Sequence, residues 1–211
     1  MDLPLAWNTT LKKVVKRAYK TGSLVDIRKA LKQIDMLQPA KRGRKINVGI
    51  LRTFTLETIR DHLCLSLSSI PCQPTLHFGE MENIEQEVLD SNSPFLKTNP
   101  DLIVVLWRLE ELHPRLSWEI DSMNLEQRRD ECNALIGRVR ELVSVYSGDA
   151  QLFLSTIALP SHWVGSLHDQ HRIYGIANII GKFNTALYEM AAENQIKIFD
   201  FAQWITHSGE I

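Results

Sequence analysis

The feature that most constrains the fold is the alternation, after Lys45, of strand-length apolar runs with helical patterns. The first run, INVGIL at 46–51, is almost continuously apolar, as expected for a strand covered on both faces. Further runs stand at 75–79, 101–107, 151–158 and 196–201. Helical segments between strands favour parallel pairing through crossovers. We therefore expect an α/β fold with a doubly wound, five-stranded parallel sheet of flavodoxin-like order 2-1-3-4-5.

The helical segments are predicted from apolar spacing and capping residues. Thr55 can cap a helix that ends before Pro71 and carries the stripe Leu56, Ile59, Leu63 and Leu67. Asn124 and Gln127 form a predicted capping box for a long helix that ends at Gly148. Its apolar stripe is Cys132, Leu135, Ile136, Val139, Leu142, Val143 and Tyr146. A later helix is predicted from Ile173, Ile176, Ile180, Phe183 and Leu187.

Charge divides the chain into two parts. Residues 1–45 carry twelve Lys/Arg against three acids, a charge of +9, whereas residues 46–211 carry twelve against twenty-two, a charge of −10. We expect residues 1–45 to form a basic helical extension, with a linker from Gln38 to Lys45, and residues 46–211 to form the α/β domain. The basic clusters are Lys12, Lys13, Lys16, Arg17 and Lys20, then Lys41, Arg42, Arg44 and Lys45. Each is either a solvated face or a dock for an acidic protein or a phosphate-bearing ligand.

Composition excludes several classes of protein. The apolar content of 44% is normal for a packed core. Cys64, Cys72 and Cys132 show no C-x-x-C spacing, which argues against a disulfide framework or a zinc site and favours a reducing, cytoplasmic compartment. No apolar run has the length of a signal peptide core or of a membrane span. Nucleic acid is disfavoured because few aromatic residues interleave with the basic arm and no motif fits.

The expected strand order predicts where a ligand would bind. In open α/β sheets, ligands lie outside the carboxyl ends of the strands, at the point where strand order reverses. That point lies between the first and third strands. The residues expected to converge there are Arg52, Thr53, Thr55, Gly79, Trp107, Arg108, His162 with its loop, and Asp200.

Four segments carry a resemblance to a known family: VGILRTFTLETIRDHL, EQEVLDSNSPFLKTNPDLIVVLW, LPSHWVGSLHDQHRIYGIANIIGKFNTALYEMA and IKIFDFAQWITHSGE. From about Ile46 onward, the chain resembles the N-terminal region of FkbH-like proteins. That family joins an SGNH-hydrolase-like domain to a haloacid-dehalogenase-like domain in polyketide biosynthesis. The resemblance implies transfer of a glyceryl unit from an activated phosphoglycerate to the thiol of a phosphopantetheinylated acyl carrier protein.

One part of that chemistry has no counterpart in this sequence. A haloacid-dehalogenase-like phosphatase needs a D-x-D pair to form an aspartyl-phosphate on Mg²⁺. This sequence contains no D-x-D. We therefore expect no cofactor or metal in this chain, and the phosphatase activity does not carry over to it. The chain resembles only the front half of the family, either as a domain excised from a protein with a haloacid-dehalogenase-like domain downstream or as a free-standing relative. By this resemblance, Lys12, Lys13, Lys16 and Arg17 are the candidates for carrier-protein docking.

The SGNH pattern implied by the resemblance is only partly present. Where hydrolases of this type have G-D-S after the first strand, this chain has Arg52-Thr53-Phe54. Gly79 fits the oxyanion glycine after the second strand, but Trp107-Arg108-Leu109-Glu110 stands in place of G-x-N-D. In the final D-x-x-H, Asp200 fits, Gln203 stands at the histidine position, and His207 lies one turn further. A serine esterase is thereby disfavoured.

Each candidate side chain has a functional and a structural hypothesis. Thr53 could attack if Asp200 and His207 activated it, or it could bond the backbone of the turn. Arg52 beside Arg108 could clamp a carboxylate or phosphate, or form an ion pair with Glu80 or Glu110. We expect Cys64 to be a core residue and Asn184 to bond a nearby backbone group. The spacing of His162, His168 and His171, with Asp169 nearby, disfavours zinc.

Three functions remain open. The first is the front domain of an FkbH-like glyceryl transferase. The second is a free-standing hydrolase or acyltransferase that uses Thr53 or His207. The third is a non-catalytic docking module for a carrier protein. We expect the turn Arg52-Thr53-Phe54-Thr55 to hold an anionic or carbonyl-bearing group without attacking it, because a strand-to-helix turn offers backbone N–H donors.

Overall fold

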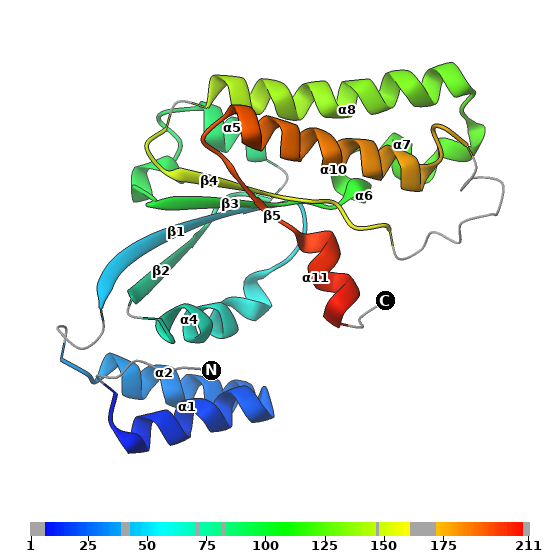
Figure 1. Cartoon of the computed structure of the whole chain (residues 1–211). Coiled ribbons are helices and arrows are strands. Elements are labelled where there is room, and N and C mark those ends of the chain that lie inside the picture. Colours follow the sequence, from blue (N-terminus) through cyan, green and yellow to red (C-terminus); the bar gives the residue numbers. More distant parts are fainter. Residues whose placement is uncertain are drawn as a thin grey trace.

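The computed structural model describes residues 7–38, 43–70, 72–81, 83–146, 148–160 and 172–208. Its centre is a five-stranded, all-parallel sheet in the order β2-β1-β3-β4-β5, which confirms the predicted fold class and strand order. The strands are β1 (Arg44–Arg52), β2 (Cys72–Phe78), β3 (Leu102–Leu106), β4 (Gln151–Ser155) and β5 (Lys197–Phe199). β1 pairs with β2 on one side and with β3 on the other, so it is an interior strand, as predicted (Figure 1).

One face of the sheet is covered by the two longest helices, α8 (Leu125–Val145) and α10 (Ile176–Glu193) (Figure 1). The shorter helices α5 (Ile84–Leu89), α6 (Leu109–Leu112) and α7 (Pro114–Trp118) complete this layer. Ile103, Val105, Leu152 and Leu154 of the sheet are buried in the resulting main core. The predicted capping box of α8 is present, because Asn124 and Gln127 each accept the other's backbone N–H.

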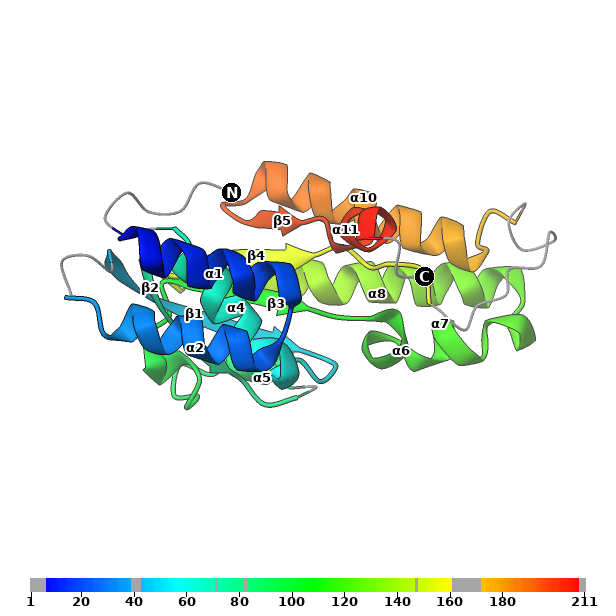
Figure 2. The ribbon, with the colours of Figure 1, turned by 90° about the horizontal axis from the view of Figure 1, so that it is seen from below.

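The opposite face is covered by α4 (Arg60–Ser68), with α11 (Phe201–Ser208) beside it and the N-terminal pair α1 (Thr9–Thr21) and α2 (Leu24–Asp35) below α4 (Figures 1 and 2). One side of α4 packs on the sheet through Leu63 and Leu67. Its other side inserts Leu65 into the core of the helical pair, with Leu11, Val15, Ala18, Ile27, Ala30 and Ile34. α4 is therefore an internal layer, and residues 7–38 pack on the α/β body.

Several predicted boundaries are wrong, each for a local reason. Thr55 caps no helix, since a 3-10 turn at Glu57–Ile59 precedes α4 and neither has Thr55 at its N-cap position. Ile59 is exposed, while Leu65, outside the predicted stripe, is buried. α8 ends at Val145 with Tyr146 as its C-cap, before Gly148. Ile173 precedes α10 and is exposed.

The strand boundaries also shift. β1 starts at Arg44 and thus takes in two residues of the predicted linker, and β2 starts at Cys72 and includes Pro74. β2 is an edge strand, where a residue without an N–H is tolerated. β4 and β5 are shorter than their apolar runs. Short 3-10 turns stand at Leu96–Thr98 and Ile120–Ser122. Within the described ranges, no helix combines the length and hydropathy that a bilayer span requires.

Candidate functional site

The carboxyl ends of β1 and β3 are joined by Thr53. Its backbone N–H donates to the Leu106 carbonyl at 3.1 Å, and its hydroxyl oxygen accepts from the Arg108 backbone N–H at 3.1 Å. The residue is only 5% exposed. Thr53 therefore closes the gap between two neighbouring strand ends, which is the role of a backbone-bonding turn residue.

Arg52 is buried under the same turn, with 6% of its surface exposed. Its guanidinium donates to the Gly79 carbonyl and to the Glu57 carboxylate, and lies 5.4 Å from the centre of the Phe78 ring. The ion-pair partner is thus Glu57, whereas the sequence suggested Glu80 or Glu110. Hydrogen bonds from its own backbone N–H, from Arg52 and from the Leu56 N–H lower the pKa of the Glu57 carboxyl, against the effect of burial.

Gly79 lies where the second strand ends, as predicted for an oxyanion glycine. Its N–H, however, donates to the Ile50 carbonyl at 3.0 Å and so continues the sheet ladder. A Cβ at this position would collide with the Leu51 side chain, which explains the need for glycine here. The backbone donor expected at this position is therefore already engaged.

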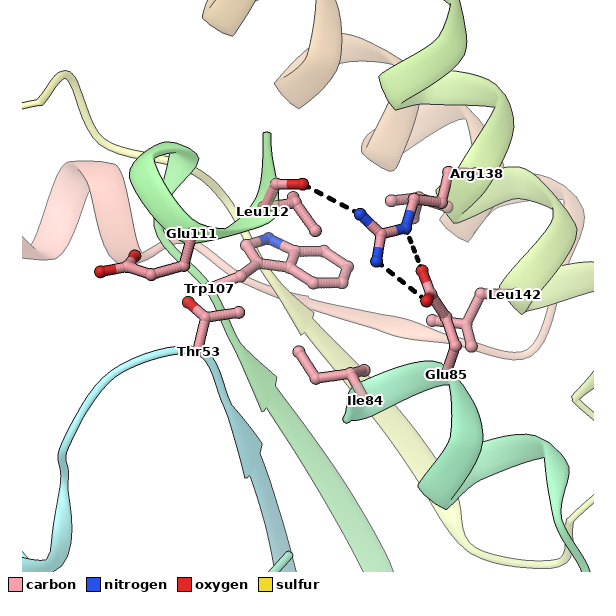
Figure 3. A pocket seen from close by; sticks show the side chains of 9 residues that line it. Thr53, Ile84, Glu85, Trp107, Glu111, Leu112, Arg138 and Leu142 are labelled. Atoms are coloured by element: carbon pink, nitrogen blue, oxygen red, sulfur yellow. Dashed lines mark hydrogen bonds and ion pairs between the residues drawn. The ribbon is translucent and has the colours of Figure 1, made fainter. Parts of the chain in front are cut away.

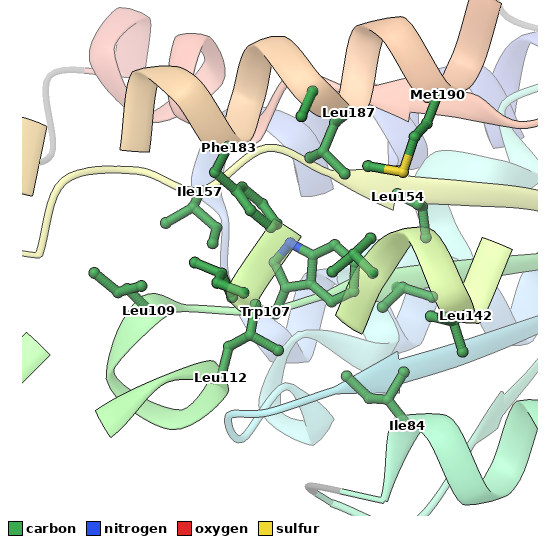
Figure 4. Close-up of a cluster of buried hydrophobic side chains, with 14 of the residues drawn as sticks. Ile84, Trp107, Leu109, Leu112, Leu142, Leu154, Ile157, Phe183, Leu187 and Met190 are labelled. Carbon is green, nitrogen blue, oxygen red and sulfur yellow. The ribbon is translucent and has the colours of Figure 1, made fainter. Parts of the chain in front are cut away.

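Trp107 belongs to the core and does not face an open crevice. Its indole Nε1 donates to the Ser155 carbonyl at 2.8 Å, and its ring meets Phe183 edge to face, with centroids 6.0 Å apart (Figure 4). One side of the ring borders a cavity of about 30 Å³ that Thr53 also lines (Figure 3). Such a volume holds one or two water molecules. It does not admit a glyceryl unit.

Across this cavity, Arg138 of α8 joins two other elements. It donates to the Leu112 carbonyl at 2.9 Å and pairs with both carboxylate oxygens of Glu85 on α5 (Figure 3). The pKa of Arg138 is raised, first by its hydrogen bonds to Glu85. Because its guanidinium bonds groups of both α5 and α6, Arg138 clamps the wall of the cavity.

Arg108 is the half-exposed cation at the strand ends. Its guanidinium lies 5.1 Å from the centre of the Phe54 ring and pairs with Glu111, and hydrogen bonds to Glu111 raise the pKa of Arg108. A cation on an aromatic face, partly open to solvent, can exchange an intramolecular carboxylate for a ligand anion. The charge that the sequence attributed to Arg52 is thus presented by Arg108.

Next to Arg108, four aromatic side chains from three segments form one surface, which we call the aromatic surface: Phe54, Phe199, Phe201 and Trp204. Phe201 is at its centre, with ring centroids 6.3 Å from Phe54, 6.1 Å from Phe199 and 6.0 Å from Trp204. Trp204 remains 55% exposed. This surface was not predicted from the sequence, although the aromatic residues around the last strand could have indicated it.

Asp200 directly precedes α11, and its carboxylate accepts three hydrogen bonds. The donors are the Thr156 hydroxyl at 3.1 Å, the Tyr188 hydroxyl at 2.7 Å and the Gln203 backbone N–H at 3.0 Å. Burial would raise the pKa of this carboxyl, but the three hydrogen bonds outweigh it and lower the pKa. The Thr156 hydroxyl also accepts from the Ala202 N–H at 2.9 Å. Asp200 and Thr156 thus fasten α11 to the end of β4.

Asn184 confirms the prediction that its amide bonds a nearby backbone group. Its oxygen accepts from the Ile157 N–H at 2.8 Å, and its nitrogen donates to the Ile157 carbonyl at 2.9 Å. One side chain on α10 therefore satisfies both polar groups of a buried residue that has just left β4. Cys64 packs against the core beneath the sheet, as expected, and burial raises the pKa of its thiol.

The remaining predicted residues are either exposed or lie outside the described residues. Thr55 lies exposed in the turn after β1. His162, His168, Asp169 and His171, as well as Lys41 and Arg42, lie outside the described residues, and so does the side chain of His207. Within the described part of the chain, no group of three or more His, Cys, Asp or Glu is arranged to hold a metal ion.

Comparison with known proteins yields structural neighbours only. No protein-family model matches the sequence, and no curated protein does. The N-terminal part of the protein BF1531 from Bacteroides fragilis, which contains a phosphatase domain and was crystallised with Mg, matches with a TM-score of 0.68 at 15% identity. The match covers 93% of this chain and 46% of that one, so this chain spans about half of its neighbour.

A GDSL-like lipase from Bacteroides thetaiotaomicron matches with a TM-score of 0.43 at 11% identity, over 85% of this chain and 79% of that one. At 15% identity, the match to BF1531 concerns the fold alone. The chain thus has the α/β fold of an N-terminal portion of BF1531, with a five-stranded parallel sheet in the order 2-1-3-4-5.

Proposed function

We propose that this chain is the front domain of an FkbH-like protein and that it takes part in loading a phosphoglycerate-derived glyceryl unit onto an acyl carrier protein without itself attacking the acyl group. The observation that carries the proposal is the state of the strand ends. The hydroxyl oxygen of Thr53 and the carboxylate of Asp200 serve hydrogen bonds that hold the fold together. For Thr53 to act as a nucleophile, a base would also have to lie within hydrogen-bond reach of its hydroxyl.

The same edge offers groups that suit binding. Phe54 stands at the position of the serine in the G-D-S of SGNH-type hydrolases, and the Arg108 guanidinium lies over the Phe54 ring. A carboxylate, phosphate or ester carbonyl can accept from Arg108 while the adjoining acyl arm lies on the aromatic surface. We assign substrate binding to Arg108 and Phe54, with Arg52 and Thr53 keeping the turn in shape beneath them.

The length of the neighbour supports the division of labour in this proposal. The N-terminal part of BF1531 contains a phosphatase domain and is about twice as long as this chain. Removal of phosphate would accordingly belong to a haloacid-dehalogenase-like partner domain that supplies the missing D-x-D. Binding of the glyceryl group and of the carrier protein would belong to the fold described above.

The proposal is tested with glyceryl-loaded and unloaded carrier protein. Intact-protein mass spectrometry should show no acyl transfer to this chain and no faster loss of glyceryl than in buffer. Binding of the loaded carrier, measured by calorimetry, should weaken about tenfold in Arg108→Ala, the effect of losing one charge-assisted contact. Arg129→Ala is the matched control, since Arg129 is also half-exposed and pairs with Glu126 and Asp130 on α8.

Two outcomes would contradict the proposal. If loaded and unloaded carrier protein bound equally well, both to wild type and to Arg108→Ala, the proposed acyl-binding site would be refuted. The chain would then be a docking module. A covalent acyl adduct on Thr53, or turnover lost in Thr53→Ala with binding intact, would make the chain a hydrolase or acyltransferase in its own right.

A further inference from the structure

The outward face of α1 is cationic along its whole length. Lys13, Lys16, Arg17 and Lys20 recur at helical spacing and are exposed, whereas Leu11, Val15 and Ala18 on the opposite side are buried. Lys12 is half-buried and lies beside this row of exposed cations. Because one side of the helix is fixed in the core of the helical pair, the lysines point away from the body of the molecule.

The two arginines of the helical pair are already engaged. Arg17 bonds Asp26 at 3.2 Å, and Arg28 bonds Asp61 of α4 at 2.7 Å. Within the described ranges, no ion pair involves the lysines of α1 or Lys29 and Lys32 of α2. The arginines therefore fix the geometry of the pair, and the lysines carry the outward charge.

α2 adds apolar side chains to this charge. Val25, Lys29, Lys32 and Met36 follow one another at intervals of four, three and four residues, which places them on one side of the helix. Val25 is 76% exposed and Met36 is 74% exposed. They are about 16 Å apart along the axis, with the two lysines between them. Both helices lie side by side (Figure 2), and they form the lowest layer in the view of Figure 1.

We propose that this surface docks an acidic amphipathic helix of a partner protein. We call it the hairpin face and define it by Lys13, Lys16, Lys20, Val25, Lys29, Lys32 and Met36. Carboxylates three or four residues apart on the partner would meet the lysine rows. Two apolar side chains about 16 Å apart would contact Val25 and Met36. The inference rests on the proposed function only for naming that partner as the carrier protein.

The described packing favours a protein helix over a membrane or a nucleic acid. A helix that binds a membrane surface buries its apolar face in the lipid, but the apolar faces of α1 and α2 are buried in their own core. Among residues 7–38, only Leu24, Val25, Met36 and the 36%-exposed Tyr19 would remain for lipid. Nucleic-acid sites use arginine and stacked aromatic rings, whereas lysines carry most of the outward charge here, and Tyr19 is the one exposed aromatic side chain among the described residues 7–38.

The test is binding to two probes at several salt concentrations. One is phosphopantetheinylated carrier protein, and the other is a synthetic acidic helix with two apolar residues eleven positions apart. The variant Lys16→Glu/Lys20→Glu/Lys29→Glu should weaken both interactions at least tenfold and flatten their salt dependence, because surface charges act over about 8 Å at physiological salt. The matched control Lys97→Glu/Lys182→Glu/Lys197→Glu changes exposed lysines elsewhere by the same charge and should leave binding within about twofold.

A second variant separates docking from general electrostatics. Val25→Ser should weaken binding of both probes about three- to tenfold, for the loss of one buried apolar side chain, without changing the salt dependence. Circular dichroism and unfolding should match wild type, since Val25 lies at the surface. An unchanged affinity would show that charge alone acts and would overturn the docking of an amphipathic helix.

The remaining outcomes of these experiments also test the proposed docking surface. Binding of the synthetic helix without binding of the carrier protein keeps the hairpin face and rejects the carrier protein as its partner. Equal losses in the hairpin and control variants overturn the inference. So does tighter, hairpin-dependent binding to phosphatidylserine vesicles or to duplex DNA, or a hairpin-dependent dimer of this chain in sedimentation.

Discussion

At the scale of single residues, the strand ends are held by polar side chains that bond backbone groups. The Thr53 hydroxyl oxygen accepts from the Arg108 N–H, and the Asn184 amide bonds both polar groups of Ile157. Such backbone groups have no strand partner once the chain leaves the sheet, and an unpaired buried N–H is costly. Polar residues at this edge thus serve the fold first, and Arg108 remains as the charge that faces outward.

Thr53→Ala should lower the free energy of unfolding by about 1–3 kcal/mol, because the Arg108 N–H loses its acceptor in a largely buried setting. Thr55→Ala is the control, since an exposed turn residue changes stability by about 0.5 kcal/mol or less. Urea denaturation measures both. If Thr53→Ala lowered the free energy of unfolding no more than Thr55→Ala does, the hydrogen bond from the Arg108 N–H to the Thr53 hydroxyl would contribute little to stability.

Asp200 should make stability depend on pH. The pKa of this carboxyl is lower in the folded state than its unfolded value of about 3.9. Its contribution is therefore complete above that unfolded value and is lost as pH falls through the lower, folded value. The stability difference between wild type and Asp200→Asn should be largest above about pH 5 and shrink towards pH 2. Urea denaturation of both proteins across this pH range measures the difference, and a difference that does not change with pH would contradict the prediction.

At the scale of elements, α4 is the structural centre of the lower half of the molecule. It meets the sheet through Leu63 and Leu67 and the helical pair through Leu65. A helix that is apolar on two sides is typical of an internal layer. This explains why Leu65 is buried although it lies outside the predicted stripe. Ile59 belongs to the 3-10 turn before α4 and is exposed.

Leu65→Ala should destabilise the contact between α4 and the helical pair by about 2–5 kcal/mol, the usual cost of truncating a fully buried leucine. Amide hydrogen exchange should then rise in α1 and α2 before it rises in β1 or β3. Leu63→Ala, on the same helix but facing the sheet, should leave exchange in α1 and α2 close to wild type. Equal exchange of the helical pair in both variants would mean that its attachment does not depend on Leu65.

At the scale of the whole molecule, two surfaces lie on different layers. The aromatic surface and Arg108 lie at the carboxyl edge of the sheet, and the hairpin face lies on the lowest layer, beyond α4 (Figures 1 and 2). The charge split in the sequence corresponds to this separation, because the helical pair and the start of β1 hold the excess of cations. We therefore propose separate surfaces for the partner and the acyl arm.

The sequence by itself determined the fold class and the strand order, because apolar runs of strand length separated by helices leave parallel pairing as the simple way to bury every strand. It also determined the capping box of α8 and the backbone role of Asn184, since both depend on contacts that residue type restricts strongly. Strand and helix ends were predicted less well, as apolar runs extend beyond the paired residues of β4 and β5.

Only the tertiary structure decided which side chains remain available at the strand ends. Arg52 and Arg108 each follow an apolar run in the sequence, yet one is buried against Gly79 and Glu57 while the other lies half-exposed on Phe54. Likewise, no local pattern shows that α11 returns to place Phe201 against Phe54. Burial and pairing depend on contacts between residues far apart in the chain, whereas periodicity reports only the local preference of each segment.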